Sequence, residues 1–200
     1  KHLKAHANMW RMTDDFWDVW DALYAMFERC EKWAPYVGEH HWPDCDMLPL
    51  GHIGIRSSEH GFTDRMTHFT REEQKTMMTL WGIFRSPLMM GGEMRDNDDW
   101  TLSLLTNEDL LAIHRDGRGA RQFMREEDIV AWHSRLTDGR DCIALFNLND
   151  EERKVSYAME QAGVSQRQSA KEIWGQKVQV EEGVISARIP PHGCICLLLS

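Results

Sequence analysis

The spacing of apolar residues changes near residue 120, and this change constrains the fold more than any other feature. Before it, short apolar segments alternate with segments whose apolar residues recur every three or four positions. After it, six short strand-like runs follow one another, separated by turn residues such as Asp138-Gly139 and Pro190-Pro191. Alternating strands and helices are typical of a parallel sheet, and successive short strands of an antiparallel sandwich. We therefore predict an α/β region followed by an all-β region.

The α/β region is expected to hold three βα units. The first unit is a strand at residues 7–12 and a helix capped by Thr13 and ended by Pro35. A short segment rich in polar groups at residues 39–48 then precedes a helix from the capping box at residues 70–73 to Arg85. The last unit is a strand at residues 86–90 and a helix from Leu110 to about His114. Three such units can neither close a barrel nor cover both faces of a parallel sheet. We expect the chain to be the C-terminal portion of a longer protein, or to take its missing strands from another chain. Either case predicts self-association or pairing with a missing N-terminal half.

Charge and composition exclude several classes of function. The chain has 23 Lys and Arg against 32 Asp and Glu, and its net charge of −9 disfavours binding to nucleic acid. No apolar stretch reaches the ~20 residues that a membrane helix needs. The five cysteines are odd in number and form no CxxC pair, so we expect buried, reduced thiols. With no secretory leader visible, these thiols favour a cytoplasmic location, although the sequence leaves the compartment open.

Arg11 and the two carboxylates that follow it are the first candidates for chemistry. Arg11 comes directly after the first expected strand, and Asp14 and Asp15 lie three and four residues further on. At the C-terminal end of a barrel strand, such groups would face the catalytic side, where one carboxylic acid could donate a proton while the guanidinium orients a hydroxyl. The alternative is a helix cap with an ion-paired arginine, which the spacing alone favours.

Residues 42–46 offer a second pair of carboxylates, Asp44 and Asp46, on one side of an extended segment. They suit catalysis or the support of a catalytic group, and a turn with side-chain-to-backbone hydrogen bonds is an equal alternative. His40 and His41 precede them, but adjacent histidines on an extended segment diverge, and no HxH or HExxH spacing occurs. No nucleotide-binding glycine motif is present either. We therefore expect neither a metal nor a cofactor.

Three motifs together resemble glycoside hydrolase family 27, the α-galactosidases and α-N-acetylgalactosaminidases. They are WRMTDD at residues 10–15, WPDCDML at residues 42–48 with Gly51 after it, and MTLWGIFRSPLM at residues 78–89. Residues 110–116 resemble the segment that leaves the last barrel helix. The resemblance is close over residues 7–125 and looser over the remainder. It implies the C-terminal part of a (β/α)8 TIM barrel in residues 1–120, followed by an antiparallel β-sandwich in residues 121–200.

The resemblance also implies roles for individual residues. Asp15, four residues after Arg11, corresponds to the general acid/base, and Asp14 is the alternative if the loop is one residue shorter. Arg11 would then contact the sugar near its 2-position. A second group would close the floor of the sugar pocket: Trp42, Asp44 and Asp46, with Met47 lining the pocket or packing behind it.

Two departures from the family pattern limit what the chain can do alone. The family's nucleophilic Asp belongs to an earlier strand that is absent here, and Cys45 replaces the usual Pro between the two Asp residues. Retaining hydrolysis needs two carboxyl groups about 5 Å apart. Asp15 could act as the acid only if burial or the partner carboxylate raised its pKa.

The resemblance therefore predicts the C-terminal fragment of a retaining glycosidase that cleaves terminal α-galactosyl-type residues. The fragment would be inactive alone, and its substrate would be a galactoside. The alternative is a non-catalytic module with a remnant barrel, which mediates assembly or contacts carbohydrate.

Overall fold

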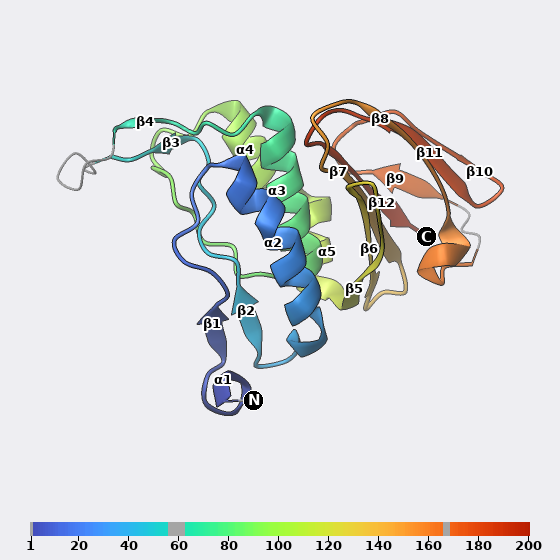
Figure 1. Ribbon diagram of the computed structural model, residues 1–200, viewed down its shortest axis with the longest axis horizontal. Helices are drawn as coiled ribbons and strands as arrows, with labels where there is room; N and C mark the ends of the chain where they lie inside the picture. Colours follow the sequence, from blue (N-terminus) through green and yellow to red (C-terminus); the bar gives the residue numbers. More distant parts are fainter. Residues whose placement is uncertain (1, 56–62, 166–168) are drawn as a thin grey trace.

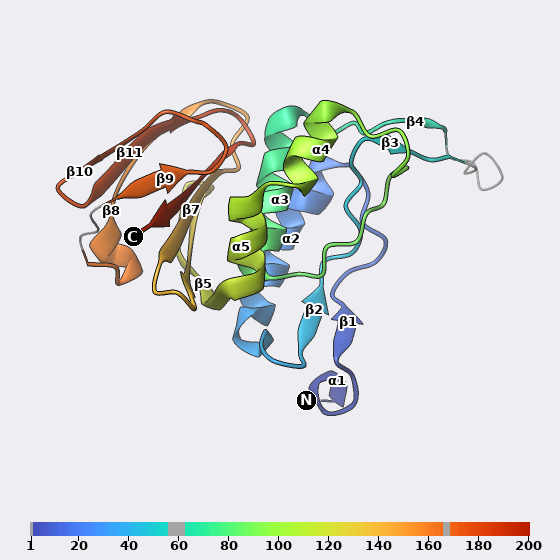
Figure 2. The same ribbon diagram turned by 180° about the vertical axis from the view of Figure 1, so that it is seen from behind.

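The computed structural model describes residues 2–55, 63–165 and 169–200. Three helices stand side by side in the middle of the molecule, with a pair of short strands on one side of them and all the C-terminal strands on the other (Figure 1). These helices are α2 (Trp20–Trp33), α3 (Arg71–Phe84) and α5 (Glu108–Asp116). The view from behind shows the same order of layers (Figure 2).

The pair of short strands is parallel. β1 (Met9–Arg11) pairs with β2 (Trp42–Asp44), with Arg11 opposite Asp44, and α2 connects the two strands. This βα connection and the parallel pairing are as the sequence predicts. The remaining elements of this region are α1 (His2–His6), the 3-10 helix η1 (Ala34–Tyr36) that contains Pro35, the antiparallel pair β3 (His52–Ile53) and β4 (Arg65–Met66), and α4 (Asp99–Leu105).

The first predicted helix begins six residues later than expected. Its N-cap is Val19, so the prediction that Thr13 caps it is wrong. Residues 12–19 instead form a loop that is held by distant groups: the Phe16 amide donates to Asp46 at 2.7 Å, and the buried Asp18 carboxylate accepts from Arg65. Periodicity does not detect such tertiary contacts, so it extends the helix too far towards the N-terminus.

The capping box of α3 is confirmed. The Thr70 hydroxyl accepts from the Glu73 amide at 3.2 Å, and the Glu73 carboxylate accepts from the Thr70 amide at 2.7 Å. The strand expected at residues 86–90, by contrast, is an extended segment with one parallel bridge, between Leu48 and Met90. The chain after β2 turns at Asp46, whose φ is 79°, so no continuous strand faces this segment.

The C-terminal strands form two antiparallel sheets, as predicted. The strands are β5 (Gly117–Glu126), β6 (Ile129–Leu136), β7 (Asp141–Asn147), β8 (Arg153–Ala158), β9 (Ala170–Glu172), β10 (Val178–Glu181), β11 (Val184–Ile189) and β12 (Cys194–Leu199). One sheet has the order β5-β6-β7-β12-β9 and the other β10-β11-β8. β5 and β9 were not among the six predicted runs. The boundary expected at residue 120 falls inside β5 and remains a prediction.

The helices and the first sheet share one hydrophobic core. Phe27 of α2 meets Phe146 of β7 edge-on at 5.0 Å between ring centroids, and Phe84 of α3 meets Trp132 of β6 at 6.3 Å. A second core fills the space between the two sheets. The five cysteines are free and buried, as predicted. The sandwich is therefore packed directly against the helices of the first region.

Candidate functional site

The candidate site lies where the two parallel strands end. Trp10 of β1 is buried and packs against Trp33 of α2, at 5.5 Å between ring centroids. Because strand side chains alternate, Met9 and Arg11 point to the opposite side, away from the helices. Met9 is 49% exposed there, and Arg11 is exposed as well. The structure thus presents Arg11 at the carboxyl end of its strand, on the face that a closed barrel would enclose.

Arg11 brings two carboxylates together. Its Nη2 lies 2.9 Å from Oδ2 of Asp46 and 3.3 Å from Oδ1 of Asp15. Asp15 follows β1 and Asp46 follows β2, so one guanidinium bridges the loops after two neighbouring parallel strands. The Asp15 side chain is 86% exposed. Asp14 is exposed too, but among the described residues no hydrogen bond or ion pair reaches its carboxylate. Of the two carboxylates, Asp15 is thus the one that Arg11 contacts.

Asp44 supports the turn that carries Asp46. Its Oδ1 accepts from the Asp46 amide at 2.8 Å, and Trp81 Nε1 donates to the Asp46 carbonyl at 3.2 Å. The Cys45 amide donates to Ser86 Oγ at 3.0 Å. Burial raises the pKa of Asp44 above its ordinary value, although the hydrogen bond from the Asp46 amide opposes the rise. This network holds Asp46 in its left-handed conformation and aims its carboxylate at Arg11 and Phe16.

Trp42 and Met47 contact other groups. Trp42 starts β2, and the Arg85 guanidinium lies 4.8 Å from its ring centroid. Met47 packs against Gly91, where a Cβ would lie 2.6 Å from the Met47 sulfur. The position of Met47 relative to a sugar, lining the pocket or packing behind it, remains a prediction. The structure thus brings Arg11, Asp15, Asp44 and Asp46 together, but not Trp42 or Met47.

Sequence reasoning missed the group that anchors the loop of Asp15. The side chain of Asp18 is 1% exposed and accepts two hydrogen bonds from Arg65, at 2.5 and 2.9 Å, and one from the His68 amide at 2.5 Å. Burial by itself would raise the pKa of Asp18, but these hydrogen bonds outweigh it and hold the pKa below its ordinary value. Asp18 stands three residues after Asp15, but no local pattern pairs it with Arg65.

Neither a metal centre nor a membrane helix is found in the part of the chain that the structure describes. Residues 2–55, 63–165 and 169–200 contain no cluster of three or more His, Cys, Asp or Glu side chains that could hold a metal ion. Over the same residues, no helix is long and apolar enough to cross a membrane.

Comparison with known proteins identifies the family. A family model described as Alpha galactosidase A matches residues 1–116, and one described as Alpha galactosidase C-terminal beta sandwich domain matches residues 126–199. The chain belongs to the alpha-galactosidase A family. It corresponds to the C-terminal portion of glycoside hydrolase family 27 enzymes, as its motifs indicate. Its fold is accordingly the C-terminal part of a (β/α)8 barrel followed by an antiparallel β-sandwich.

Individual members of this alpha-galactosidase family are similar over nearly the whole chain. A GH27 β-L-arabinopyranosidase structure from Geobacillus stearothermophilus is 52% identical, with a TM-score of 0.91, and the match covers 99% of this chain and 46% of that one. The alpha-galactosidase of Cyamopsis tetragonoloba is 28% identical, over 98% of this chain and 46% of its own length. That of Oryza sativa subsp. japonica is 25% identical, over 96% and 44% respectively. The chain therefore spans just under half the length of these relatives.

Proposed function

We propose that the chain carries the acid/base half of a retaining glycosidase that releases terminal α-galactosyl-type residues, with Asp15 as the acid/base. The main support for this proposal is that the Arg11 guanidinium contacts both Asp15 and Asp46, at the carboxyl ends of β1 and β2. Catalytic groups of TIM barrels lie at this end of the strands. The family supports glycoside hydrolysis as the reaction.

Two chemical steps follow from this assignment. A carboxylate from the part of the barrel outside this chain attacks the anomeric carbon, while Asp15 gives its proton to the departing glycosidic oxygen. Asp15 then removes a proton from water as the water displaces the enzyme carboxylate, which frees the sugar with its configuration retained. The missing half of the barrel would supply both the nucleophile and the burial that a general acid needs.

Arg11 and Asp46 are proposed to hold the sugar. Both are partly exposed at the strand ends, and a guanidinium and a carboxylate can each bridge two neighbouring hydroxyl groups. Arg11 would face the 2-position of the sugar. The buried Asp44 would act through Asp46 by accepting a hydrogen bond from its amide. Trp42 and Met47, which contact Arg85 and Gly91, would complete the floor of the pocket only in the full barrel.

The substrate class is narrowed by the relatives. An α-D-galactopyranoside and a β-L-arabinopyranoside have the same ring configuration and differ by one hydroxymethyl group on C5. The curated relatives are alpha-galactosidases, and the structure that is 52% identical is a β-L-arabinopyranosidase. We therefore propose a galactoside as the substrate, with the arabinopyranoside as the competing glycoside that the assay must include.

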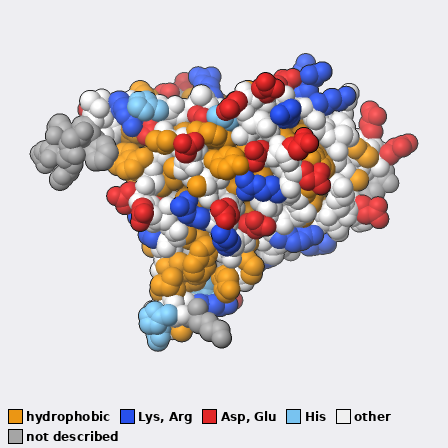
Figure 3. Space-filling model, in the orientation of Figure 1, with side chains coloured by type: hydrophobic (Ala, Val, Ile, Leu, Met, Phe, Trp, Pro, Cys, Tyr) orange, Lys and Arg blue, Asp and Glu red, His pale blue; other side chains and the backbone are white. Residues whose placement is uncertain are grey.

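The partner proposed for the chain is the rest of the barrel. Among the described strands, β1 pairs only with β2, so its other edge is free. Apolar side chains gather near β1 and α1 on the face in Figure 3. A pocket of about 670 Å³ lies there, lined in part by Leu3, Trp33 and His41. A free strand edge beside an apolar surface suits the docking of further barrel strands.

The experiment compares the chain alone with a longer protein that restores the barrel. Both are assayed with 4-nitrophenyl α-D-galactopyranoside and 4-nitrophenyl β-L-arabinopyranoside. We expect no turnover by the chain alone, and turnover of one or both substrates once the missing half is present. Turnover by the chain alone that Asp15→Asn abolishes would contradict the proposed division of labour.

A further inference from the structure

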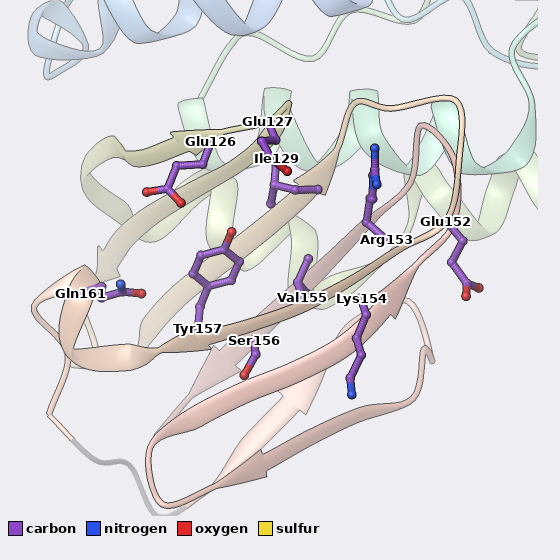
Figure 4. Close-up of a pocket in the computed structure, with 10 residues that line it drawn as sticks. All are labelled: Glu126, Glu127, Ile129, Glu152, Arg153, Lys154, Val155, Ser156, Tyr157 and Gln161. Atoms are coloured by element: carbon purple, nitrogen blue, oxygen red, sulfur yellow. The ribbon is translucent and has the colours of Figure 1, made fainter.

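The sandwich contains a groove of about 1020 Å³ on its rim, separate from the loops that carry Asp15 and Asp46. It lies between β8, the edge strand of the three-stranded sheet, and the turn that joins β5 to β6 (Figure 4). Residues from three elements line it: Glu126, Glu127 and Ile129 at the turn, Arg153, Val155 and Tyr157 on β8, and Gln161 after β8.

The groove has an apolar floor and one half-buried aromatic ring. Val155 and Ile129 are buried and belong to the core between the two sheets. Tyr157 lies two residues beyond Val155 on the same face of β8, so its ring extends this floor towards solvent. Figure 4 shows the Tyr157 hydroxyl pointing towards the β5–β6 turn, with Gln161 beside the ring. The apolar face that remains open is therefore the face of a tyrosine.

The polar groups around this ring are not used by the fold. Within the described residues, no hydrogen bond or ion pair engages the side chains of Glu126, Glu127, Tyr157 or Gln161. Glu152, at the far end of the groove, is by contrast paired with Arg188 at 3.0 Å. Burial, together with the charges of Glu126 and Glu127, raises the pKa of Tyr157, which is consistent with two carboxylates near its hydroxyl.

From this arrangement we propose that the groove is a second carbohydrate-binding site. A pyranose ring would lie against Tyr157 through its C–H face, and Glu126, Glu127 and Gln161 would bind its hydroxyl groups. Carboxylates and amides are planar groups that can bridge neighbouring hydroxyls, and a ring with one apolar face and polar edges matches a tyrosine flanked by such groups. Arg153 in the same groove disfavours a cationic ligand.

The choice of a galactoside as ligand rests on the proposed function, but the groove contains none of the residues assigned to catalysis. It would hold a polymeric or oligomeric galactoside while the barrel acts on a terminal residue. Binding can therefore be measured on this chain whether or not the chain turns over a substrate.

The test uses saturation-transfer NMR with raffinose and affinity electrophoresis in galactomannan, with dextran as the polymer control. Tyr157→Ala is expected to weaken binding about tenfold. Tyr157→Phe, which keeps the ring, should retain most of the binding, and Tyr36→Ala, which removes a tyrosine outside the groove, should change nothing. Glu126, the exposed last residue of β5, is replaced in Glu126→Gln, which tests the site without disturbing the core.

Three outcomes overturn the proposal. One is no binding of either galactoside by the folded chain, and another is unchanged binding in both Tyr157→Ala and Glu126→Gln. The third is binding that Arg11→Met abolishes while Tyr157→Ala leaves it intact, which would place the sugar in the proposed catalytic pocket.

Discussion

Asp18 and Arg65 form a two-hydrogen-bond ion pair, at 2.5 and 2.9 Å, that ties the loop carrying Asp15 to strand β4. The carboxylate is 1% exposed and the guanidinium 26%. Because Asp18 also accepts from the His68 amide, its removal would break three hydrogen bonds, two from Arg65 and one from that amide.

Asp18→Ala is expected to lower the free energy of unfolding by about 3 kcal/mol, because it leaves the partly buried Arg65 guanidinium without its ion-pair partner. Urea unfolding monitored by circular dichroism measures this. The control is Asp14→Ala, an exposed carboxylate in the same loop, which should change stability by less than about 0.5 kcal/mol. Equal effects of the two substitutions would refute the anchoring role.

The ion pair also makes a pH prediction. The pKa of Asp18 is lower in the folded than in the unfolded chain, so its stabilising contribution is full above the unfolded pKa and is lost as pH falls through the folded one. Stability measured from pH 6 down to pH 2 should therefore fall less steeply in Asp18→Asn than in the parent. A curve of the same slope in the variant would show that Asp18 is not perturbed.

The pKa of His52 is raised, so its contribution to stability changes with pH in the opposite direction to that of Asp18. His52 lies between Asp64 and Asp96, and hydrogen bonds to Asp64 and then Asp96 raise its pKa to about 8. The pKa of His52 is therefore higher in the folded chain than in the unfolded chain, where it is ~6.5. The charged imidazole contributes its full stabilisation below the unfolded pKa, and this contribution is lost as the pH rises through about 8. NMR titration of the His52 ring should show this midpoint, and Asp96→Asn should lower it. An unshifted midpoint in the parent chain would be evidence against the bridge.

The N-terminus of α3 tests the capping box. Thr70→Ala removes the acceptor for the Glu73 amide and is expected to cost about 1 kcal/mol of stability. Thr137→Ala, at an exposed turn, is the matched control and should be nearly neutral. Thermal or urea denaturation that fails to separate the two variants would contradict the cap.

The core that the helices share with the first sheet predicts one cooperative unfolding transition. Phe146→Ala would remove a ring that packs on Phe27 and should cost about 3 kcal/mol or more. The variant should still unfold in a single step when followed by both helix-sensitive and tryptophan signals. Two separate transitions would mean that the barrel part and the sandwich are energetically independent.

The features that the sequence predicts well are those encoded by neighbours in the chain. The Thr70 capping box lies within four residues, and the apolar runs of β7 and β12 are continuous. β5 was missed because its glycines and mostly unburied side chains hide the strand pattern. The start of α2 was misplaced because contacts from residues 30 and 47 positions away, Asp46 and Arg65, hold the loop before it.

The candidate site likewise depends on contacts between residues that are far apart in the sequence. Spacing alone favoured a helix cap for the carboxylates after Arg11, and only the family motifs selected Asp15. The contact between Arg11 and Asp46 depends on the parallel pairing of β1 with β2 and on the turn at Asp46. The alternation of strands and helices predicts a parallel sheet, but no local pattern encodes the left-handed turn at Asp46.

The central claim, that Asp15 is the acid/base, is tested most directly by the leaving-group dependence of a protein with the complete barrel. Proton donation matters for an alkoxide leaving group and little for 2,4-dinitrophenolate. Asp15→Asn should therefore lower kcat/KM by about 10³-fold or more for methyl α-D-galactopyranoside, but far less for the 2,4-dinitrophenyl galactoside. Equal losses on both substrates, or the same selective loss in Asp14→Asn instead, would contradict the assignment.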